Sequence, residues 1–209
     1  MMSRERTQSP ESLDDPVRAR IVAEARRHFL QHGFRGVTMS DLATELGMSK
    51  KTLYAHFLTK IELVEAVLRN KFDTIESDLA SINTVGSTDF LAALQQMLAC
   101  VQKHTDEVNP SFIRDVQRAS PELFQVVEGR RRELIQRYFG ALFIEGRKRG
   151  MVRKDVPIDV IVAVLLASTQ AIVNPRALTE LKLTPTTGFA SILAIVLDGA
   201  LTPKGRSAS

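Results

Sequence analysis

The chain has 209 residues, of which 44% are hydrophobic and 25% are charged, and this balance excludes wholesale disorder and a fibrous repeat. Its single cysteine, Cys100, excludes an internal disulfide and a cysteine metal cluster. The longest apolar stretch, residues 160–167, is far shorter than the roughly 18 to 20 residues that cross a bilayer, so we expect no membrane span.

The first residues, 1–16, are polar and acidic and contain no apolar signal region. We expect them to form a disordered arm in front of a cytoplasmic protein. The first helix is expected to begin at Asp15, whose side chain can cap it, and at Pro16, which suits the first helical position. It should end at Gly33, because glycine adopts the left-handed conformation that closes many helices.

Two very short helices are expected next. Thr38 is followed three places on by Asp41, an acidic form of the capping box that begins a helix. Gly47 then breaks the chain, and Ser49 caps a third helix that runs to about Phe57. Two short helices joined by a turn of about four residues form a helix-turn-helix, which presents its second helix to the major groove of DNA.

A long fourth helix is expected from Thr59, which forms a capping box with Glu62. Apolar residues at intervals of three and four predict five further helices, near residues 89–105, 110–118, 121–149, 157–174 and 186–201. No stretch alternates as a strand does. The sequence therefore predicts an all-α protein of about nine helices.

The net charge of +4 is concentrated near the N-terminal end. Residues 18–60 contain eight basic and three acidic side chains, and this excess suits a polyanionic partner. A second basic run, residues 130–154, is interpreted mainly as the solvated face of a long helix. It would also suit an anionic ligand.

The segment LGMSKKTLYAHFLTK, residues 46–60, concentrates hydroxyl, basic and aromatic side chains. Tyr54 and His56 point about 200° apart on a helix, so they cannot act together on one bond. No histidine or carboxylate stands three or four places from His56, so no metal site is indicated. The residues leave two alternatives, a solvated surface helix and a DNA-recognition helix; the capped helix-turn-helix and the local positive charge favour the second.

A longer stretch also resembles a known family. The sequence VTMSDLATELGMSKKTLYAHFLTKIELVEAV, residues 37–67, resembles the DNA-binding signature of the TetR/AcrR transcriptional regulators, and ARRHFLQHGFRG before it resembles their first helix. The specific resemblance covers roughly residues 17–70. Beyond it, the chain is similar to the family only in its size, its helical content and its apolar terminal helices.

The resemblance implies particular DNA contacts. Tyr54, His56 and Lys60 would contact phosphates, the last also through the backbone N–H groups at its helix start, and Thr38 would lie against the same DNA backbone. Lys51 would read guanine. The residues implied to face the groove are Ser49, Lys50, Lys51 and Thr52.

The body is expected to hold a small-molecule effector and a homodimer interface. The last two helices, residues 157–201, are nearly uniformly apolar, so they lie either in the core of one protomer or at a four-helix interface between two copies. We favour the interface, with Leu165 and Val196 in it. Polar side chains in the body are candidates for ligand contacts, although each is more often a satisfied structural group. These candidates are His104, Arg114, Tyr138, Gln170 and Asn174.

The sequence thus predicts a homodimeric repressor, released from a palindromic operator by an unknown small molecule. An activator or an effector-independent regulator remains an alternative, and an all-α enzyme or small-molecule carrier is a remote one. We expect no catalytic residues, cofactor or metal. The expected parts are an N-terminal arm (1–16), a helix-turn-helix domain (17–62), a helical effector-binding and dimerisation domain (63–202) and a C-terminal tail (203–209).

Overall fold

The computed structural model describes residues 15–82 and 90–203. Within these ranges the chain is helical, with no β-strand beyond a single bridge between Val152 and Leu201, so the expected all-α fold is confirmed. Nearly all of the expected N-terminal arm and of the expected tail lies outside the described residues. The helices are α1 (Pro16–Gly36), α2 (Met39–Glu45), α3 (Lys50–His56), α4 (Lys60–Ser81), α5 (Phe90–Asp106), α6 (Pro110–Ala119), α7 (Pro121–Leu134), the π-helical segment η1 (Ile135–Phe139), α8 (Gly140–Lys148), α9 (Ile158–Ile172), α10 (Pro175–Glu180) and α11 (Pro185–Ala200).

The helix boundaries follow the capping signals closely. Asp15 accepts a hydrogen bond from the backbone N–H of Val17, and Thr38 and Asp41 form a reciprocal capping box at α2. Gly33 has a φ of +79° and interrupts α1, which resumes for one more turn. A side chain at Gly33 would also come within 2.8 Å of Ser111 Oγ, so this glycine lets α6 approach α1.

Two features of the body differ from the sequence prediction. The single helix expected over residues 121–149 is continuous but contains η1, one π-helical turn, between α7 and α8. The segment after α9, where no helix was predicted, contains the short helix α10. Asn174 caps α10 by accepting a hydrogen bond from the N–H of Ala177. Short capped helices of this kind have too few residues to show a periodic pattern.

The chain has two apolar cores. The first lies among α1, α2, α3 and the beginning of α4, and residues from α6 and α7, including Phe112 and Leu123, complete it. We call this packed unit the head. The second core lies among the end of α4, α5, the long helix α7–η1–α8, α9 and α11, and we call it the body. The expected domain boundary between residues 62 and 63 thus falls inside α4, which contributes to both cores.

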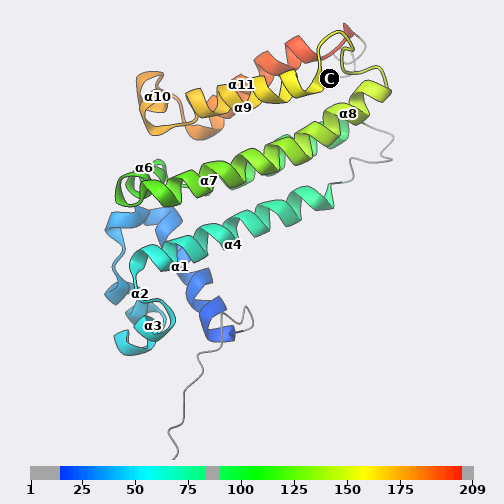
Figure 1. Cartoon of the computed structure of the whole chain (residues 1–209). Coiled ribbons are helices and arrows are strands. Elements are labelled where there is room, and N and C mark those ends of the chain that lie inside the picture. Colours follow the sequence, from blue (N-terminus) through cyan, green and yellow to red (C-terminus); the bar gives the residue numbers. More distant parts are fainter. Residues whose placement is uncertain (1–14, 83–89, 204–209) are drawn as a thin grey trace, which may run out of the picture.

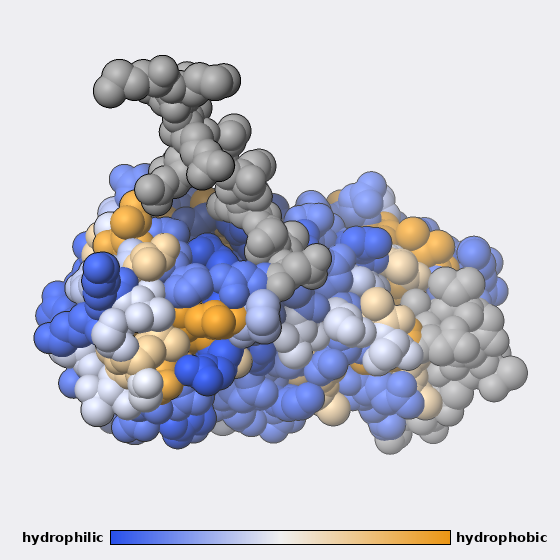
Figure 2. All heavy atoms as spheres, turned by 90° about the horizontal axis from the view of Figure 1, so that it is seen from below, coloured by the Kyte–Doolittle hydropathy of each residue, from blue (hydrophilic) through white to orange (hydrophobic). Residues whose placement is uncertain are grey.

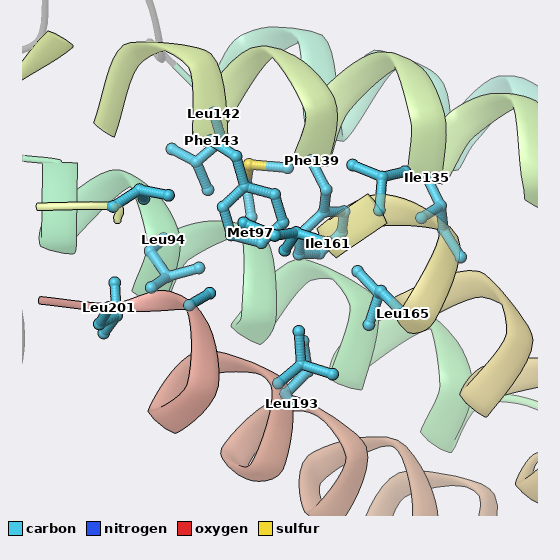
Figure 3. Packing of buried hydrophobic residues seen from close by; sticks show 14 of the residues in the cluster. Leu94, Met97, Ile135, Phe139, Leu142, Phe143, Ile161, Leu165, Leu193 and Leu201 are labelled. Atoms are coloured by element: carbon cyan, nitrogen blue, oxygen red, sulfur yellow. The ribbon is translucent and has the colours of Figure 1, made fainter. Parts of the chain in front are cut away.

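The body core is close-packed at the end farther from the head. Figure 3 shows Met97 of α5 and Phe139 and Phe143 of the long helix grouped around Ile161 of α9, and all four are nearly inaccessible to solvent. The helices around this cluster therefore form a tightly fitted unit.

The two ends of the molecule are well separated. α2 and α3 lie at one extremity, α9 and α11 lie at the other, and α4 and α7 cross the space between them (Figure 1). Seen from the head side, the surface is mostly hydrophilic with small apolar patches (Figure 2). Among the described helices, none combines the length and the apolar character needed to cross a membrane.

Candidate nucleic-acid interface

The helix-turn-helix consists of α2, a tight turn and α3. Gly47, with a φ of +62°, makes the turn, and Ser49 begins α3 by accepting a hydrogen bond from the N–H of Thr52 at 3.0 Å. Leu42, Leu53 and Phe57 are fully buried and fix the two helices against each other. The geometry therefore presents the outer face of α3 on a rigid support.

Two arginines of α1, which no sequence pattern marked, also hold this unit. Arg18 donates to the carbonyl of His56 at 2.6 Å and lies over the ring of Phe57, and Arg20 donates to the carbonyl of Leu46 at 3.0 Å. These carbonyls lie at the ends of α3 and α2, where intrahelical donors are missing. No local pattern distinguishes such arginines from solvated ones, because their acceptors are more than 25 residues away in the sequence.

Most of the predicted DNA-contacting side chains are exposed on one part of the head. Ser49 and Thr52 are hydrogen-bonded to each other through their hydroxyls at 2.8 Å, and Tyr54 is 44% exposed. Leu58, just after α3, is 77% exposed. The exposed members of the predicted set are Thr38, Ser49, Lys50, Lys51, Thr52 and Tyr54.

The other two predicted residues, His56 and Lys60, are half-buried and already have partners. His56 Nδ1 lies 3.0 Å from a carboxylate oxygen of Asp15. The ammonium of Lys60 donates to the carbonyl of Phe34 and lies 4.1 Å from the centre of the Phe34 ring. Burial lowers the pKa of Lys60, and Asp115 and Asp41 partly offset this. The side chain of Lys60 therefore joins the start of α4 to the end of α1.

The body contains a cavity of about 630 Å³ between the head and the close-packed core. α4 contributes Leu68, Phe72, Ile75 and Leu79 to its wall, and further walls come from α5, α6, the α7–η1 helix, α9 and α11. The size and the mainly apolar lining are typical of small-molecule sites. The π-helical turn contributes Ile135 and Phe139, and such turns occur often at functional sites.

The five ligand candidates fall in different places. His104, Gln170 and Asn174 border the cavity, whereas Arg114 borders a separate space of about 100 Å³ beside α10. Tyr138 borders neither of these spaces; its hydroxyl lies 3.4 Å from the carbonyl of Glu76. The side chain of Asn174 is engaged in capping α10.

A charged network forms the wall between the cavity and the joint of α1, α4 and α5. The ammonium of Lys71 donates to the carboxylate of Glu107 and lies 3.2 Å from His104 Nδ1, while His104 Nε2 lies 2.9 Å from a carboxylate oxygen of Asp78. Arg26 extends the network to the head: it donates to Asn70 and Thr74 on α4 and to Glu107. Cavity and head are therefore joined by continuous polar contacts.

Burial and hydrogen bonding both shift pKa values in this network. Desolvation lowers the pKa of Lys71 and of His104 below their ordinary values. Hydrogen bonds from Lys103 and His104 lower the pKa of Asp78, and Lys71 lowers that of Glu107 against the opposing effect of burial. A neutral His104 that donates to Asp78 and accepts from Lys71 satisfies both of its ring nitrogens.

Two groups of side chains bring potential metal-ligating atoms within 4.8 Å of one another: Asp78 with Cys100 and His104, and Glu24 with His28 and Glu45. In each group a cationic side chain is already bonded to a carboxylate. Lys103 donates to Asp78 at 3.1 Å, and Arg27 donates to Glu24. These cations supply the positive charge that a metal would bring, so we assign no metal to either group.

The basic run 130–154 forms internal ion pairs in large part. Arg130 and Arg137 both pair with Glu76 on α4, and Arg149 pairs with Glu145 on its own helix. These contacts join α7 and η1 to α4. They favour the interpretation of this run as a structural and solvated helix face.

The sequence and the fold match known proteins. Residues 21–67 match the family model described as bacterial regulatory proteins of the tetR family. The chain is 27% identical over 180 residues to YvaF of Bacillus subtilis strain 168, an uncharacterized HTH-type transcriptional regulator, covering 86% of this chain and 93% of that protein. It is 26% identical over 164 residues to the HTH-type transcriptional repressor DhaR of Mycobacterium sp. strain GP1, covering 74% and 79%.

A solved structure with a similar fold is that of KstR2 of Mycobacterium tuberculosis, described as a ketosteroid transcriptional regulator. The TM-score is 0.54 at 22% identity, and the match covers 91% of this chain and 97% of that one. At this identity the likeness concerns the fold.

Proposed function

The chain belongs to the tetR family of bacterial regulatory proteins and is a DNA-binding transcriptional regulator, and from that premise we propose that it is a homodimeric repressor released from a palindromic operator by a small molecule. The main observation in support is the helix-turn-helix, whose α3 exposes basic and hydroxyl side chains on a fully buried apolar support. Relatives named as repressors, such as DhaR, favour repression over activation.

We propose that the exposed face of α3 enters the major groove. Lys51 would read guanine, with Ser49, Lys50 and Thr52 beside it, while Tyr54 and Thr38 contact phosphates. His56 belongs to the same phosphate-contacting set. For Lys60 we propose a contact through the backbone N–H groups at the start of α4, because its ammonium is bound to Phe34.

Binding to genomic fragments, measured by fluorescence anisotropy over a range of salt concentrations, tests these contacts. Lys51→Ala is expected to lose about 1 to 3 kcal/mol of discrimination at one base pair. Tyr54→Phe is expected to weaken binding to all sequences alike. Lys154→Ala, an exposed lysine of the body, is the control and should change neither property; equal effects from all three variants would refute the assignment.

We propose that α9 and α11 form the dimer interface through their outer faces. Val160 and Val164 are nearly half exposed and Ile195 is 73% exposed, and exposed alanines lie beside them on both helices. Leu165 and Val196, which the apolar pattern suggested as interface residues, are instead buried inside the protomer, with exposures of 0% and 8%. The expectation for these two residues was therefore wrong, because both helices have a second apolar face that packs in the body core.

Sedimentation equilibrium tests this interface. Ile195→Glu and Val164→Glu should convert a dimer to monomers with a folded helical spectrum, because an unpaired charge at the centre of an interface is costly. Val126→Glu is the matched control, since Val126 is 64% exposed but lies on α7. A stable dimer in all three variants would move the interface elsewhere.

We propose that an effector in the cavity acts through α4. This helix is the next one after α3 and contributes five side chains to the cavity wall, namely Lys71 and four apolar ones. A ligand that fits better when α4 is displaced shifts the population toward a spacing of the two heads that does not match DNA.

A filled cavity should imitate the effector. Ile75→Trp adds bulk inside the cavity and is expected to weaken DNA binding at least tenfold. Ala80→Trp, on the exposed side of the same helix, should leave it unchanged. Unchanged binding in Ile75→Trp, with a melting temperature near the wild-type value, would favour an effector-independent regulator.

A further inference from the structure

The cavity carries an excess of positive charge in an otherwise apolar wall. Among its lining residues Glu128 is the acidic one, and four are basic: Lys71, Arg131, Arg132 and Arg176. Lys71 is neutralised from behind by Glu107, which does not line the cavity. Arg176 is likewise paired with Glu180 on its own helix. Arg131 and Arg132, opposed by Glu128 alone among the lining residues, remain as the source of the excess.

Arg131 is the basic residue best placed to meet a ligand. One of its terminal nitrogens donates to Glu128, and within the described part of the chain its other N–H groups have no hydrogen-bond partner. They are not sealed in protein, because the side chain keeps 26% of its surface accessible while lining the cavity. Burial lowers the pKa of Arg131, whereas acidic partners raise the pKa of Arg130 and Arg153. The guanidinium is therefore desolvated by protein yet has unused donors.

The lining of the cavity changes from exposed side chains at its rim to buried apolar side chains in its interior. Side chains that border the cavity and are also exposed, such as Gln125 near the start of α7 and Arg176 near the start of α10, mark its rim. Lining side chains that are buried and apolar, including Ile135 and Phe139, lie about one and two turns beyond Arg131 along the long helix, toward the close-packed core. Arg131 lies between these two regions along the helix that Figure 1 shows crossing the molecule.

We infer that the cavity binds an amphipathic carboxylate, with its carboxylate on Arg131 and its apolar part toward Ile135 and Phe139. A guanidinium with free parallel N–H groups binds a carboxylate in a bidentate manner, and such a pair gains strength where water is excluded. The apolar part gains by leaving water for the buried side chains. This inference rests on the proposed function only for its regulatory consequence; binding itself does not require DNA.

Glu128 has a definite role in this site. Its carboxylate competes with the ligand for Arg131, and it is the acidic member of the lining. Removing its charge should therefore tighten the binding of an anion. A residue that merely supported the fold would not have this effect.

Isothermal titration calorimetry with probes of equal chain length tests the inference on the unmodified protein. Dodecanoate, dodecanol and dodecyltrimethylammonium carry a negative charge, no charge and a positive charge. We expect dodecanoate to bind at least tenfold more tightly than either of the others. Equal affinities for all three probes, or no binding by any of them, would overturn the proposal. DNA binding is measured in a separate experiment, so failure of this proposal would not bear on the proposed function.

Variants assign the charge preference to a residue. Arg131→Gln should abolish the preference for dodecanoate over dodecanol, and Glu128→Gln should increase it. Arg137→Gln, on the next turns of the same helix but outside the cavity lining, is the matched control. If Arg131→Gln unfolds, the double variant Arg131→Gln/Glu128→Gln removes both charges together and should also lose the preference. A preference that survives in the double variant would overturn the assignment to Arg131.

The apolar part of the natural ligand is either a flexible chain or a fused ring system. Dodecanoate and 5β-cholanate, each compared with its alcohol, represent the two sources. Tighter binding of one carboxylate identifies the shape of the cavity's ligand, provided that the alcohols bind more weakly. Release of a bound genomic fragment by the tighter carboxylate would connect this site to regulation; binding without release would contradict the effector mechanism but not the site.

Discussion

The head and the cavity region of the body are built from similar amphipathic helices but are filled differently. In the head, Leu42, Leu53 and Phe57 have no accessible surface. In the body, Phe72 and Ile75 occupy equivalent inward positions on α4 and remain half-buried because they face a space of about 630 Å³. The helix α4 therefore joins a region of fixed shape to one with room for a ligand.

The largest expected effect is on the free energy of unfolding, in two matched variants that replace phenylalanine by alanine. Phe57→Ala should cost about 3 to 5 kcal/mol of unfolding free energy, as expected for an aromatic side chain removed from a close-packed core. Phe72→Ala should cost less than half as much, since it enlarges a space that already exists. Urea denaturation followed by circular dichroism measures both. Equal costs would mean that the cavity region is as tightly filled as the head.

The end of the body that is remote from the cavity should be as tightly packed as the head. At Gly146 an added Cβ would collide with the ring of Phe90, so Gly146→Ala should destabilise the protein by about 1 to 3 kcal/mol. Gly129→Ala, where a Cβ meets no atom within 4 Å, should instead stabilise it by about 0.5 to 1 kcal/mol. In thermal unfolding, the melting temperature of Gly146→Ala should lie below that of the wild type, and the melting temperature of Gly129→Ala should lie above it. An unchanged melting temperature in Gly146→Ala would show that this core rearranges readily to accommodate an added methyl group.

Lys60 tests how the head is attached to α4. Lys60→Ala should lower the unfolding free energy by about 1 to 2 kcal/mol, because it loses a charge-assisted hydrogen bond and the cation–π contact with Phe34. Lys50→Ala, which removes an exposed lysine, should leave stability within about 0.5 kcal/mol. If the two variants are equally stable, the ammonium of Lys60 does not hold α1 in solution.

A smaller effect should appear between pH 7.5 and 5.5. The pKa of His104 is lowered from its ordinary value of 6.5 by burial, so the unfolded chain takes up this proton before the folded chain does. Stability should therefore fall as the pH drops through 6.5. The carboxylates of Asp78 and Glu107 act in a separate, more acidic window, because their pKa values are lowered from 3.8 and 4.5.

The variant His104→Gln should have a flatter stability profile in that range. His32→Gln, which replaces an exposed histidine of α1, should keep the wild-type profile. Urea midpoints at several pH values provide the measurement. A profile that is unchanged in His104→Gln would assign the pH dependence to other groups.

Local patterns predicted the head more fully than the body. Capping by Thr38 and Ser49 and the turn at Gly47 depend on neighbours within a few residues, and all three were predicted correctly. The inward position of the Lys60 ammonium was not predicted, since its partner Phe34 is 26 residues away. Distant partners of this kind leave no periodic trace in the sequence.

The cavity, and the division of α9 and α11 into a buried and an exposed face, could be identified only in the structure. Periodicity marks a side chain such as Leu165 as apolar, but it does not tell whether that side chain fills its own core or an outer face like that of Val164. A cavity forms where several helices leave unfilled space between them. No single segment of the sequence determines this arrangement. In the sequence Arg131 is one member of a basic run, and only the folded structure places it in the cavity wall.

Footprinting on genomic fragments tests whether the exposed face of α3 recognises an operator. A homodimer with two rigid heads should protect two half-sites whose centres are about 34 to 36 Å apart along the duplex, and Lys50→Ala/Lys51→Ala should abolish this footprint while the protein remains folded. The absence of any sequence-specific footprint, or a footprint unchanged in the double variant, would contradict the account.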